Sequence, residues 1–295
     1  MNYRHAFHAG NFADVMKHIA LARVIEHLKL KDKPFRFIDT HAGTGLYDIS
    51  GDEAERSGEW REGIGAVLDD GKLAPFQASP GSNLAGLLEP YFNVLRELNG
   101  ATQDESRGLR YYPGAGELAR RLMREDDRLV LNELHPDDGA ALRQRMFRDE
   151  RVRTLQLDGW LAVKSLLPPK ERRSVMLIDP PFEQVGEFAR LEQALSDAIA
   201  RFATGTTMIW FPIKAGGASD AFLKRMAQSG HTRLLAAELL IRHRDTPQGL
   251  NGAGLLIHNP TYGLDQQLEL ILAWLSRQFG QSAGAGSNVR WLAGE

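Results

Sequence analysis

The chain contains no cysteine. Disulfide bonds, thiolate metal sites and thiol catalysis are therefore excluded. The sequence also lacks an apolar run long enough to span a bilayer. Its first eleven residues are polar, with His and Arg where the apolar segment of a signal peptide would lie. These absences predict a cytoplasmic protein.

An overall basic charge is missing too, because 36 Lys and Arg face 38 Asp and Glu, which gives a net charge of −2. This balance argues against a general nucleic-acid binder, but the charges are unevenly spread. Residues 1–36 hold seven basic and three acidic side chains, residues 140–175 hold nine and four, and residues 48–112 hold six and twelve. Local basic faces on a neutral body suit selective contact with a polyanion, although the counts alone favour ordinary solvated helix faces.

The first part of the chain predicts one helix, one strand and a turn. Apolar residues at helical spacing predict an amphipathic helix over 13–30, capped by Asn11 or Asp14. Residues 35–39 read as a short buried strand that runs into a Gly-rich turn at 40–45. The acidic, proline-broken stretch that follows predicts helical pieces at 60–68 and 83–98 and no strand.

From residue 128 onward, strands and helices are predicted to alternate, which indicates an α/β protein with a mostly parallel sheet covered on both faces. Counted with the strand at 35–39, the sheet has seven strands and is Rossmann-like, with one strand antiparallel near the end. Residues 281–287 are predicted as a flexible link to a last apolar segment at 289–292. The expected strands are 128–132, 152–156, 175–178, 206–211, 234–242 and 254–258, and the expected helices are 136–148, 159–167, 188–203, 218–229 and 264–279.

Polar residues follow the predicted strands in a coherent way. Ligands of such sheets bind beyond the carboxyl ends of the strands, and here those ends carry the turn 39–45, Glu133, Asp158 and Asp179. A Gly-rich turn and two acids suit a nucleotide-like cofactor. A dinucleotide is the alternative, but the turn is not G-x-G-x-x-G and the acid expected about 20 residues later is displaced to Glu133. The pattern therefore favours a methyl donor over a nicotinamide.

The motif Ile178-Asp-Pro-Pro-Phe182 indicates chemistry at an amino nitrogen. Two prolines stop the strand and stiffen the corner. The Asp179 carboxylate and the Pro180 carbonyl can then accept hydrogen bonds from the two N–H groups of an amine such as adenine N6. These bonds free the lone pair of the nitrogen. Phe182 offers a face on which a base can stack. The alternative is a Pro-Pro turn with only a structural role. The position of the motif, after a buried strand and within the array of strand-end acids, favours a catalytic role instead.

With these motifs in view, the sequence resembles the bacterial ribosomal RNA large subunit methyltransferase J family, whose members methylate N6 of adenine in 23S ribosomal RNA. The resemblance runs nearly from end to end, and the N-terminal block is its most specific part. Its marks are Tyr3-Arg-His-Ala-Phe-His-Ala-Gly-Asn11 with Asp14, Lys17 and His18, then Asp39-Thr-His-Ala-Gly43, Tyr111-Tyr-Pro-Gly114, Glu133-Leu-His-Pro136, Asp158-Gly159, Ile178-Asp-Pro-Pro181 and Arg201-Phe-Ala-Thr-Gly205.

The resemblance implies a class I methyltransferase fold whose domain spans 1–47 and 113–295, with a helical insertion subdomain at 48–112. It implies S-adenosyl-L-methionine as the cofactor and protein-free 23S ribosomal RNA as the substrate and partner. Neither a membrane nor an obligate protein partner is expected.

The resemblance also implies roles for individual residues. Asp179 and Pro180 are the expected catalytic pair. This chain departs from the family pattern at two positions. Ala115 replaces the serine that follows Tyr-Pro-Gly, so a side-chain hydroxyl contact is lost. Phe182 replaces the tyrosine that follows Pro-Pro, so a phenol hydrogen bond is lost. The expected cofactor contacts are Lys17, His18, His41, Gly43, Ala115, Glu133, Asp158, Gly159 and Asp179, and the expected substrate contacts are Tyr3, Arg4, His5 and Phe182.

Other functions remain as alternatives. A DNA adenine-N6 methyltransferase would share the chemistry, but no helix-turn-helix signal is visible. A non-catalytic RNA-binding assembly factor is disfavoured because the three strand-end acids are intact. No metal is expected, since the histidines at 5, 8, 18 and 41 lack the cysteines or spaced carboxylates that would complete a site.

Several residues keep two interpretations. Trp60, Trp210 and Phe211 are expected in the core rather than stacked on a base. The spaced lysines at 29, 31 and 33 are expected in a loop near the RNA. Five arginines, at 143, 145, 148, 151 and 153, either follow phosphates or form a solvated helix face.

Overall fold

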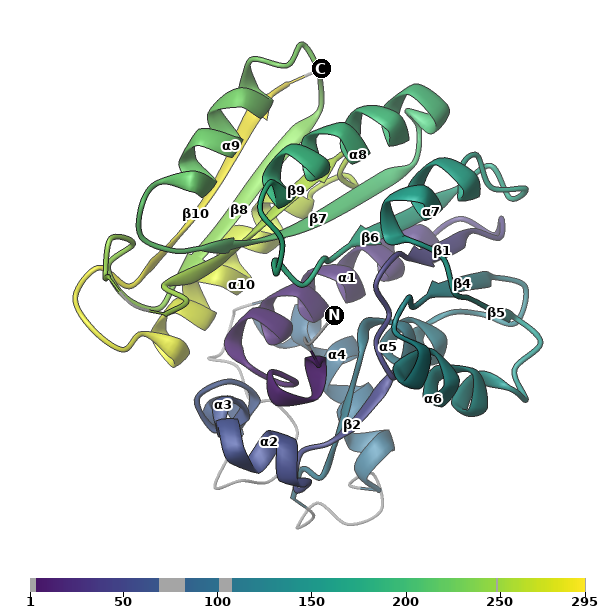
Figure 1. Cartoon of the computed structure of the whole chain (residues 1–295), viewed down its shortest axis with the longest axis horizontal. Coiled ribbons are helices and arrows are strands. Elements are labelled where there is room, and N and C mark those ends of the chain that lie inside the picture. Colours follow the sequence, from purple (N-terminus) through teal and green to yellow (C-terminus); the bar gives the residue numbers. More distant parts are fainter. Residues whose placement is uncertain (1–3, 69–82, 101–107, 248, 295) are drawn as a thin grey trace.

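The computed structural model describes residues 4–68, 83–100, 108–247 and 249–294. Its centre is an eight-stranded sheet with the strand order β10-β8-β9-β7-β6-β1-β4-β5 (Figure 1). The α/β fold class predicted from the sequence is confirmed. The strands are β1 (Arg36–Asp39), β4 (Arg128–Asn132), β5 (Val152–Leu155), β6 (Ser174–Ile178), β7 (Thr206–Ile213), β8 (Leu234–Leu240), β9 (Gly252–His258) and β10 (Gly286–Ala293).

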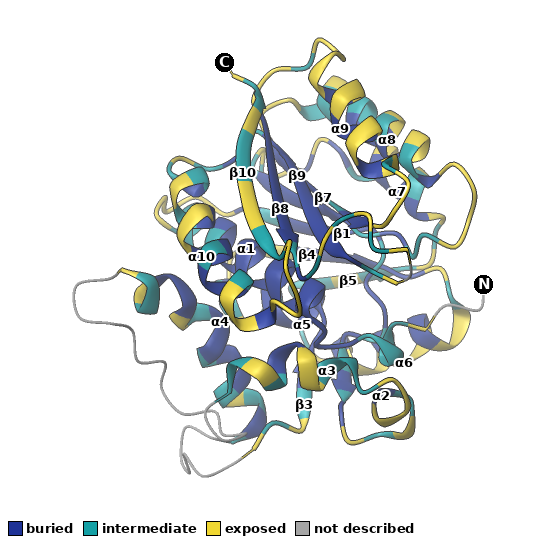
Figure 2. Cartoon of the chain, turned by 90° about the vertical axis from the view of Figure 1, so that its left-hand side faces the viewer, coloured by how far each residue is buried: buried dark blue, intermediate teal, exposed yellow. Residues whose placement is uncertain are grey.

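Two strands run against the others. The pairs that join β5, β4, β1, β6 and β7 are parallel, whereas β9 is antiparallel to both β7 and β8 and β10 is antiparallel to β8. The prediction of seven strands with one antiparallel was therefore wrong by one strand. Residues 286–293 cover the otherwise open edge of the buried β8, and in Figure 2 this edge strand is coloured as exposed or intermediate along its length. An edge strand needs little apolar patterning, which explains why the sequence predicted only a flexible link and a short apolar segment here.

Helices cover both faces of the sheet. Successive residues of each buried strand point to opposite faces, so Phe37 joins one core and Ile38 the other. The core that contains Ile38 packs beneath α7 (Gly159–Leu166), α8 (Glu187–Phe202) and α9 (Ala218–Ala227). Within the described residues no helix is both long and apolar enough to cross a membrane. The opposite core packs beneath α1 (Phe12–Lys29), α5 (Ala115–Leu122), α6 (Pro136–Met146) and α10 (Leu264–Phe279).

Helix α1 is buried on every side over its first three turns, contrary to the amphipathic helix that was expected. All residues from Phe12 to Ala22 are buried. The reason is that α1 touches α5 on one side, the inserted α4 (Leu84–Asn99) on another and α10 on a third. Asn11 caps its first turn by accepting the backbone N–H of Asp14 at 3.0 Å. The polar residues of α1 therefore lie inside the protein.

The described residues between Asp48 and Tyr111 form a helical layer below the sheet in Figure 1. Its described helices are α2 (Asp52–Ser57), α3 (Glu59–Glu62), the short 3-10 helix η2 (Ile64–Val67) and α4. A two-stranded antiparallel ladder of β2 (Leu46–Asp48) and β3 (Tyr111–Pro113) joins the points where the chain enters and leaves it. The expectation of no strand near this segment was wrong, because three-residue strands are too short to show an alternating pattern. Helix α5 had also gone unpredicted.

Candidate active site

A cavity of about 740 Å³ opens at the carboxyl edge of the parallel strands. Its walls come from the first turns of α1, the Gly-rich turn after β1 and the residues that follow β4, β6 and β7. This edge is where doubly wound sheets bind ligands. The volume falls within the roughly 300–1,000 Å³ of small-molecule sites. The cavity is therefore the candidate active site.

A buried ammonium group links α1 to the end of β6. Lys17 Nζ lies 2.7 Å from Asp14 Oδ1 and 2.5 Å from Asp179 Oδ2, and the Lys17 side chain is only 5% exposed. Burial disfavours the charged lysine, but the carboxylates of Asp14 and Asp179 outweigh burial and hold the pKa of Lys17 above its ordinary value. The lysine is therefore a fixed cation that orients Asp179 and leaves its Oδ1 without a protein partner among the described residues.

Asp14 ties the N-terminal segment to this ion pair. Its Oδ2 accepts from the His5 ring at 2.9 Å and from the Gly10 backbone N–H at 3.1 Å. Burial opposes ionisation, yet His5 and Lys17 hold the pKa of Asp14 well below its usual range. His5 is the first residue of the 3-10 helix η1 (His5–Phe7), and the centre of its ring lies 5.2 Å from the centre of the Tyr47 ring. The segment before α1 is thus anchored at the cavity.

Glu133, directly after β4, holds the Gly-rich turn in place. One of its oxygens accepts the Gly43 N–H at 2.8 Å and the other accepts the His135 N–H at 2.8 Å. Burial raises the pKa of Glu133 against these two donors. Gly43 has φ +57°, and a Cβ built there would lie 2.1 Å from the Tyr47 hydroxyl. Only glycine suits this position, and its backbone is open to a ligand.

Asp39, the last residue of β1, lies buried between the other acids. Burial raises the pKa of Asp39 to about 7, and the nearby carboxylates of Asp179 and Glu133 also raise it. The backbone N–H of His41, which donates to Asp39 at 3.1 Å, acts in the opposite direction. A carboxyl group of this kind is ready to ionise when a cation arrives.

A second, smaller hollow adjoins the cavity and shares His41, Glu133 and Pro180 with it. Asp158 and Gly159 line this hollow rather than the main cavity. Asp158 caps α7, since its Oδ1 accepts from Trp160 N at 2.9 Å and Leu161 N at 3.1 Å. Within the described residues, the other oxygen, Oδ2, accepts no hydrogen bond. A Cβ on Gly159 would lie 2.4 Å from His41 Nε2, so glycine makes room for the imidazole.

The Asp-Pro-Pro-Phe corner places an aromatic ring on the cavity wall. Phe182 has φ +53°, a conformation that costs energy for a residue with a side chain and that clusters at functional sites. Its ring packs edge-on to Phe188 at 5.2 Å and to Trp210 at 5.7 Å. Trp210, expected in the core, is half-buried and also borders the cavity.

The structure gathers most of the predicted site residues in one place. The main cavity is bordered by Asp179, Pro180, Phe182 and His5, and by Lys17, His18, His41, Gly43, Ala115 and Glu133. His18 is almost fully buried, with Nδ1 3.0 Å from the Tyr112 hydroxyl and burial lowering its pKa to about 3. Arg4 is not on the cavity wall, and forms ion pairs with Glu53 and Asp138 at 3.5 Å. The predicted contact Tyr3 lies outside the described residues.

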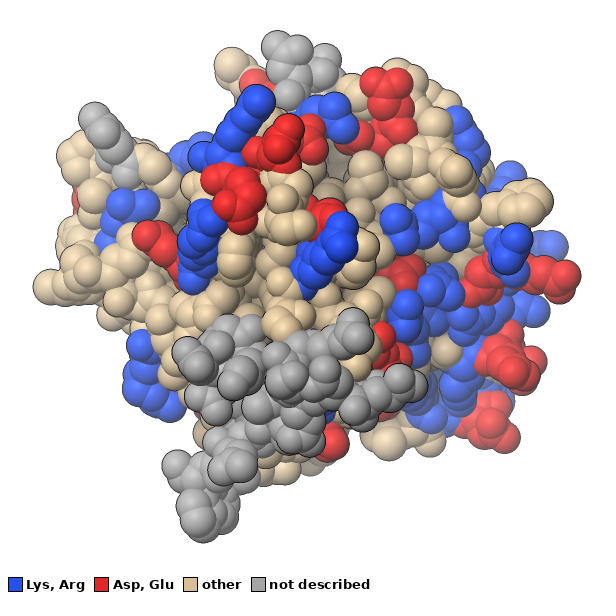
Figure 3. Space-filling model, turned by 90° about the horizontal axis from the view of Figure 1, so that it is seen from below, with Lys and Arg blue, Asp and Glu red and all other residues tan. Residues whose placement is uncertain are grey.

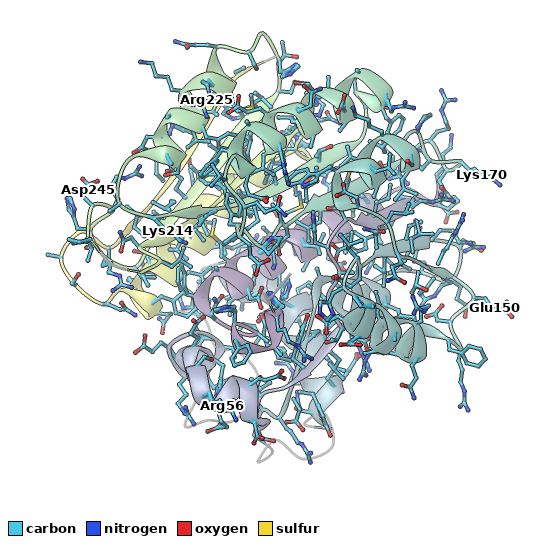
Figure 4. All side chains as sticks on the ribbon, viewed as in Figure 1. Arg56, Glu150, Lys170, Lys214, Arg225 and Asp245 are labelled. Carbon is cyan, nitrogen blue, oxygen red and sulfur yellow. The ribbon has the colours of Figure 1, made fainter. Side chains whose placement is uncertain are left out.

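Several cavity residues had not been singled out. Asp14 was expected only as a possible helix cap and as part of a sequence block, because an acid near the start of a helix gives no sign that it is buried and binds several partners. Lys214 follows β7 and lines the cavity, and Figure 4 shows it on the loop between β7 and α9. Because Lys214 follows a predicted strand, the sequence could have indicated that it lies at the ligand-binding edge of the sheet. Within the described ranges, no group of three or more His, Cys, Asp or Glu residues is placed to hold a metal ion.

The topology and the site define a class of protein. In the sheet, β9 lies between β7 and β8 and is antiparallel to both. An acid follows each central parallel strand, and a Gly-rich turn follows β1. This is the arrangement of the class I methyltransferases, which use S-adenosylmethionine. The residues present fit that cofactor, because a cavity of ligand size lies beside the Gly-rich turn and the carboxylates of Glu133 and Asp158 lie at the walls of the two hollows.

Comparison with known proteins narrows the class to a family. The family model described as "Ribosomal RNA large subunit methyltransferase D, RlmJ" matches residues 32–293. The chain belongs to this family. It is 36% identical over the full length of both chains to the ribosomal RNA large subunit methyltransferase J of Escherichia coli and, again at 36%, to that of Haemophilus influenzae. The crystal structure of protein LPL1258 from Legionella pneumophila is 32% identical, with a TM-score of 0.82 over 96% of this chain and 98% of that chain.

Proposed function

We propose that this protein transfers the methyl group of S-adenosylmethionine to N6 of an adenine in protein-free 23S ribosomal RNA. The observation that carries the proposal is Asp179, held by a buried lysine at the end of β6 with one carboxylate oxygen turned to a ligand-sized cavity. Family membership supports ribosomal RNA as the polymer, since the two relatives are named as methyltransferases of the large ribosomal subunit's RNA.

Residues on both hollows would hold the cofactor. Glu133 would accept the ribose hydroxyls while it keeps the Gly43 turn in place. Asp158, whose Oδ2 is uncommitted, would accept the adenine amine of the cofactor beside Gly159. Asp39 would meet the cationic part of the molecule and ionise as it binds. When bound, the cofactor supplies a methyl group on a positively charged sulfur.

The Asp-Pro-Pro-Phe corner would prepare the target base. Asp179 Oδ1 and the Pro180 carbonyl would accept hydrogen bonds from the two N6–H groups, which would turn the nitrogen lone pair out of the ring plane. Methylation of N6 would leave one surplus proton on the nitrogen, and Asp179 would accept that proton. Lys17 keeps that carboxylate oriented throughout, and the Phe182 ring supports the face of the base. Catalysis by this route is mostly positioning and electrostatics.

We also propose a division of the chain. Residues 1–47 and 113–295 would form the methyltransferase domain and residues 48–112 an inserted subdomain. The β2–β3 ladder at the boundary and the position of Glu59 on the cavity wall support this division. The inserted segment would then complete the site on the side opposite the sheet.

The proposal is tested by product mapping. The purified protein is incubated with the cofactor and a protein-free 23S transcript, and in parallel with assembled large subunits and with duplex DNA. We expect one N6-methyladenosine in the free transcript and little transfer to the other two substrates. Equal transfer to duplex DNA would overturn RNA as the substrate, and methylation at a position other than N6 would overturn the role given to Asp179.

A further inference from the structure

The exposed side of α6 carries arginines that lack acidic partners. Arg143, Arg145 and Arg148 are exposed at α6 and the residues that follow it, and within the described chain none of the three forms an ion pair with a carboxylate. We call these three residues the α6 basic face. In Figure 3, Lys and Arg side chains gather on the right, the side on which Figure 1 places α6 and β5.

Arginines elsewhere are mostly tied to the protein, which makes this face unusual. Arg151, in the same segment, binds Asp149 at 2.6 Å and donates to the Met123 carbonyl at 2.9 Å. Of the five arginines that the sequence suggested as phosphate contacts, Arg151 is therefore structural. The neighbouring acid Asp138 forms an ion pair with Arg4, and Asp137 and the outward-lying Glu150 (Figure 4) are exposed acids in the same stretch of the chain. Three arginines without a carboxylate partner in the described chain give this surface a basic character.

An aromatic side chain lies among these arginines. Phe147, at the end of α6, is 85% exposed. A phenyl ring in water costs free energy that a solvated charged face would not need. Exposed aromatic rings beside arginines are how proteins stack unpaired bases while binding the backbone. Phe147 thus distinguishes a nucleic-acid surface from an ordinary solvated helix.

The α6 basic face is continuous with the cavity. His135, the residue before α6, borders the cavity, and α6 extends about 16 Å from it at 1.5 Å per residue. The aliphatic part of Arg145 lies against Gly45, in the same turn as Gly43. An RNA whose target base enters the cavity can therefore cross this face with its neighbouring nucleotides.

We infer that the α6 basic face binds the phosphates of the RNA substrate beside its target nucleotide, and that Phe147 stacks on an unpaired base there. This inference rests on the proposed function, since it needs RNA as the substrate. The arginines add affinity through phosphate contacts, which do not depend on sequence, and the ring adds a preference for unpaired nucleotides.

The test compares three variants on a protein-free 23S transcript. The first is Arg143→Gln/Arg145→Gln/Arg148→Gln, which keeps helix propensity because Gln and Arg are similar in this respect. The second is Phe147→Ala. The control, Arg201→Gln/Lys224→Gln/Arg277→Gln, removes the same charge from exposed positions on α8, α9 and α10. The dissociation constant is measured against salt concentration, with the cofactor affinity of each variant as a check on folding.

We expect the α6 triple variant to bind RNA on the order of tenfold to a hundredfold more weakly at low salt, with the salt slope reduced by about two. Phe147→Ala should lose about tenfold with an unchanged slope, because stacking releases no counterions. A triple variant indistinguishable from the control overturns the docking surface, and full affinity in Phe147→Ala overturns the stacking contact.

Methyl transfer by the wild-type protein on the same transcript separates two kinds of failure. If the wild type methylates RNA and the α6 variants behave as the control does, only the docking surface is overturned. If the wild type does not act on RNA at all, the proposed function fails and the inference fails with it.

Discussion

Lys17 and Asp179 lie 162 residues apart in the chain, yet Lys17 Nζ and Asp179 Oδ2 are 2.5 Å apart in the fold. The same ammonium group contacts Asp14 Oδ1 at 2.7 Å. One buried cation therefore serves two carboxylates, of which one anchors the N-terminal segment and the other belongs to the proposed catalytic corner. Structure and proposed chemistry are joined at this lysine.

Replacing Lys17 with Met should destabilise the protein strongly. The change removes the ammonium group that the buried carboxylate of Asp14 shares with Asp179, and breaking a buried ion pair in this way costs about 3–5 kcal/mol. The measurement is the free energy of unfolding in urea. The double variant Asp14→Asn/Lys17→Met should lose clearly less than the sum of the two single changes. Lys29→Met, which breaks a half-exposed pair with Glu26 on the same helix, should cost less than about 1 kcal/mol.

Replacing Asp179 with Asn should separate activity from folding. The amide keeps the size of the side chain but loses the negative charge that accepts the N6 proton, so we expect kcat to fall by about 100-fold or more. Lys17 keeps Asp14 as its partner, so the free energy of unfolding should change by only about 1–2 kcal/mol. A variant with kcat near the wild-type value would show that Asp179 is not the acceptor.

Replacing Phe182 tests the stacking role of the corner. Base stacking on an aromatic ring contributes about 1–3 kcal/mol, so Phe182→Ala should lower kcat/KM on the RNA by roughly 5- to 150-fold. Phe182→Tyr keeps the ring and should stay within a few-fold of the wild type. If alanine and tyrosine behave alike, Phe182 has only a packing role against Phe188 and Trp210.

Adding one carbon at Gly159 should disturb cofactor binding. A Cβ there would lie 2.4 Å from His41 Nε2, and Gly159 begins α7, so the imidazole must move. We expect Gly159→Ala to cost about 1–3 kcal/mol of stability and to weaken S-adenosylmethionine binding in calorimetry. Gly286→Ala on β10, where a Cβ would meet nothing within 4 Å, is the matched control. Equal cofactor affinity in the two variants would remove the His41–Gly159 contact from the site.

The carboxyl group of Asp39 should give a measurable pH dependence. Its pKa is raised to about 7 in the folded protein from 3.8, so between these values the folded state binds more protons than the unfolded state. Its contribution to stability is therefore complete below about pH 4 and is lost as the pH rises to about 7. Asp39→Asn should be more stable than the wild type at pH 8, with the advantage disappearing near pH 4. A constant difference across this range would contradict the raised pKa.

Much of the fold could be predicted because most elements are long or bounded by clear signals. The strand before Asp179 and the helices on both faces follow from apolar runs, alternation and turn residues. Strand β10 could not be predicted in the same way, because an edge strand such as Gly286–Ala293 is held by backbone hydrogen bonds to β8 and needs no apolar face. The burial of the first three turns of α1 depends on packing by segments far away in the sequence.

The site was predictable where chemistry follows a strand and not where it depends on packing. Glu133, Asp158 and Asp179 each follow a strand, and the topology brings strand ends together. The partner of Asp179 could not be found in this way, because Lys17 reaches it from the interior of a helix. Asp158 also turned out to line a separate hollow, since capping α7 turns its side chain away from the main cavity.

The burial of α1 has a consequence for how the chain is made. This helix leaves the ribosome before α10, at 264–279, which is one of the surfaces that cover it. The side of α1 that packs against α10 must therefore wait for the synthesis of these later residues before it is shielded from water. During that interval the nascent protein exposes a helix that is apolar on several sides, which is a surface that aggregates or recruits chaperones. A chain truncated before residue 264 would keep that exposure permanently.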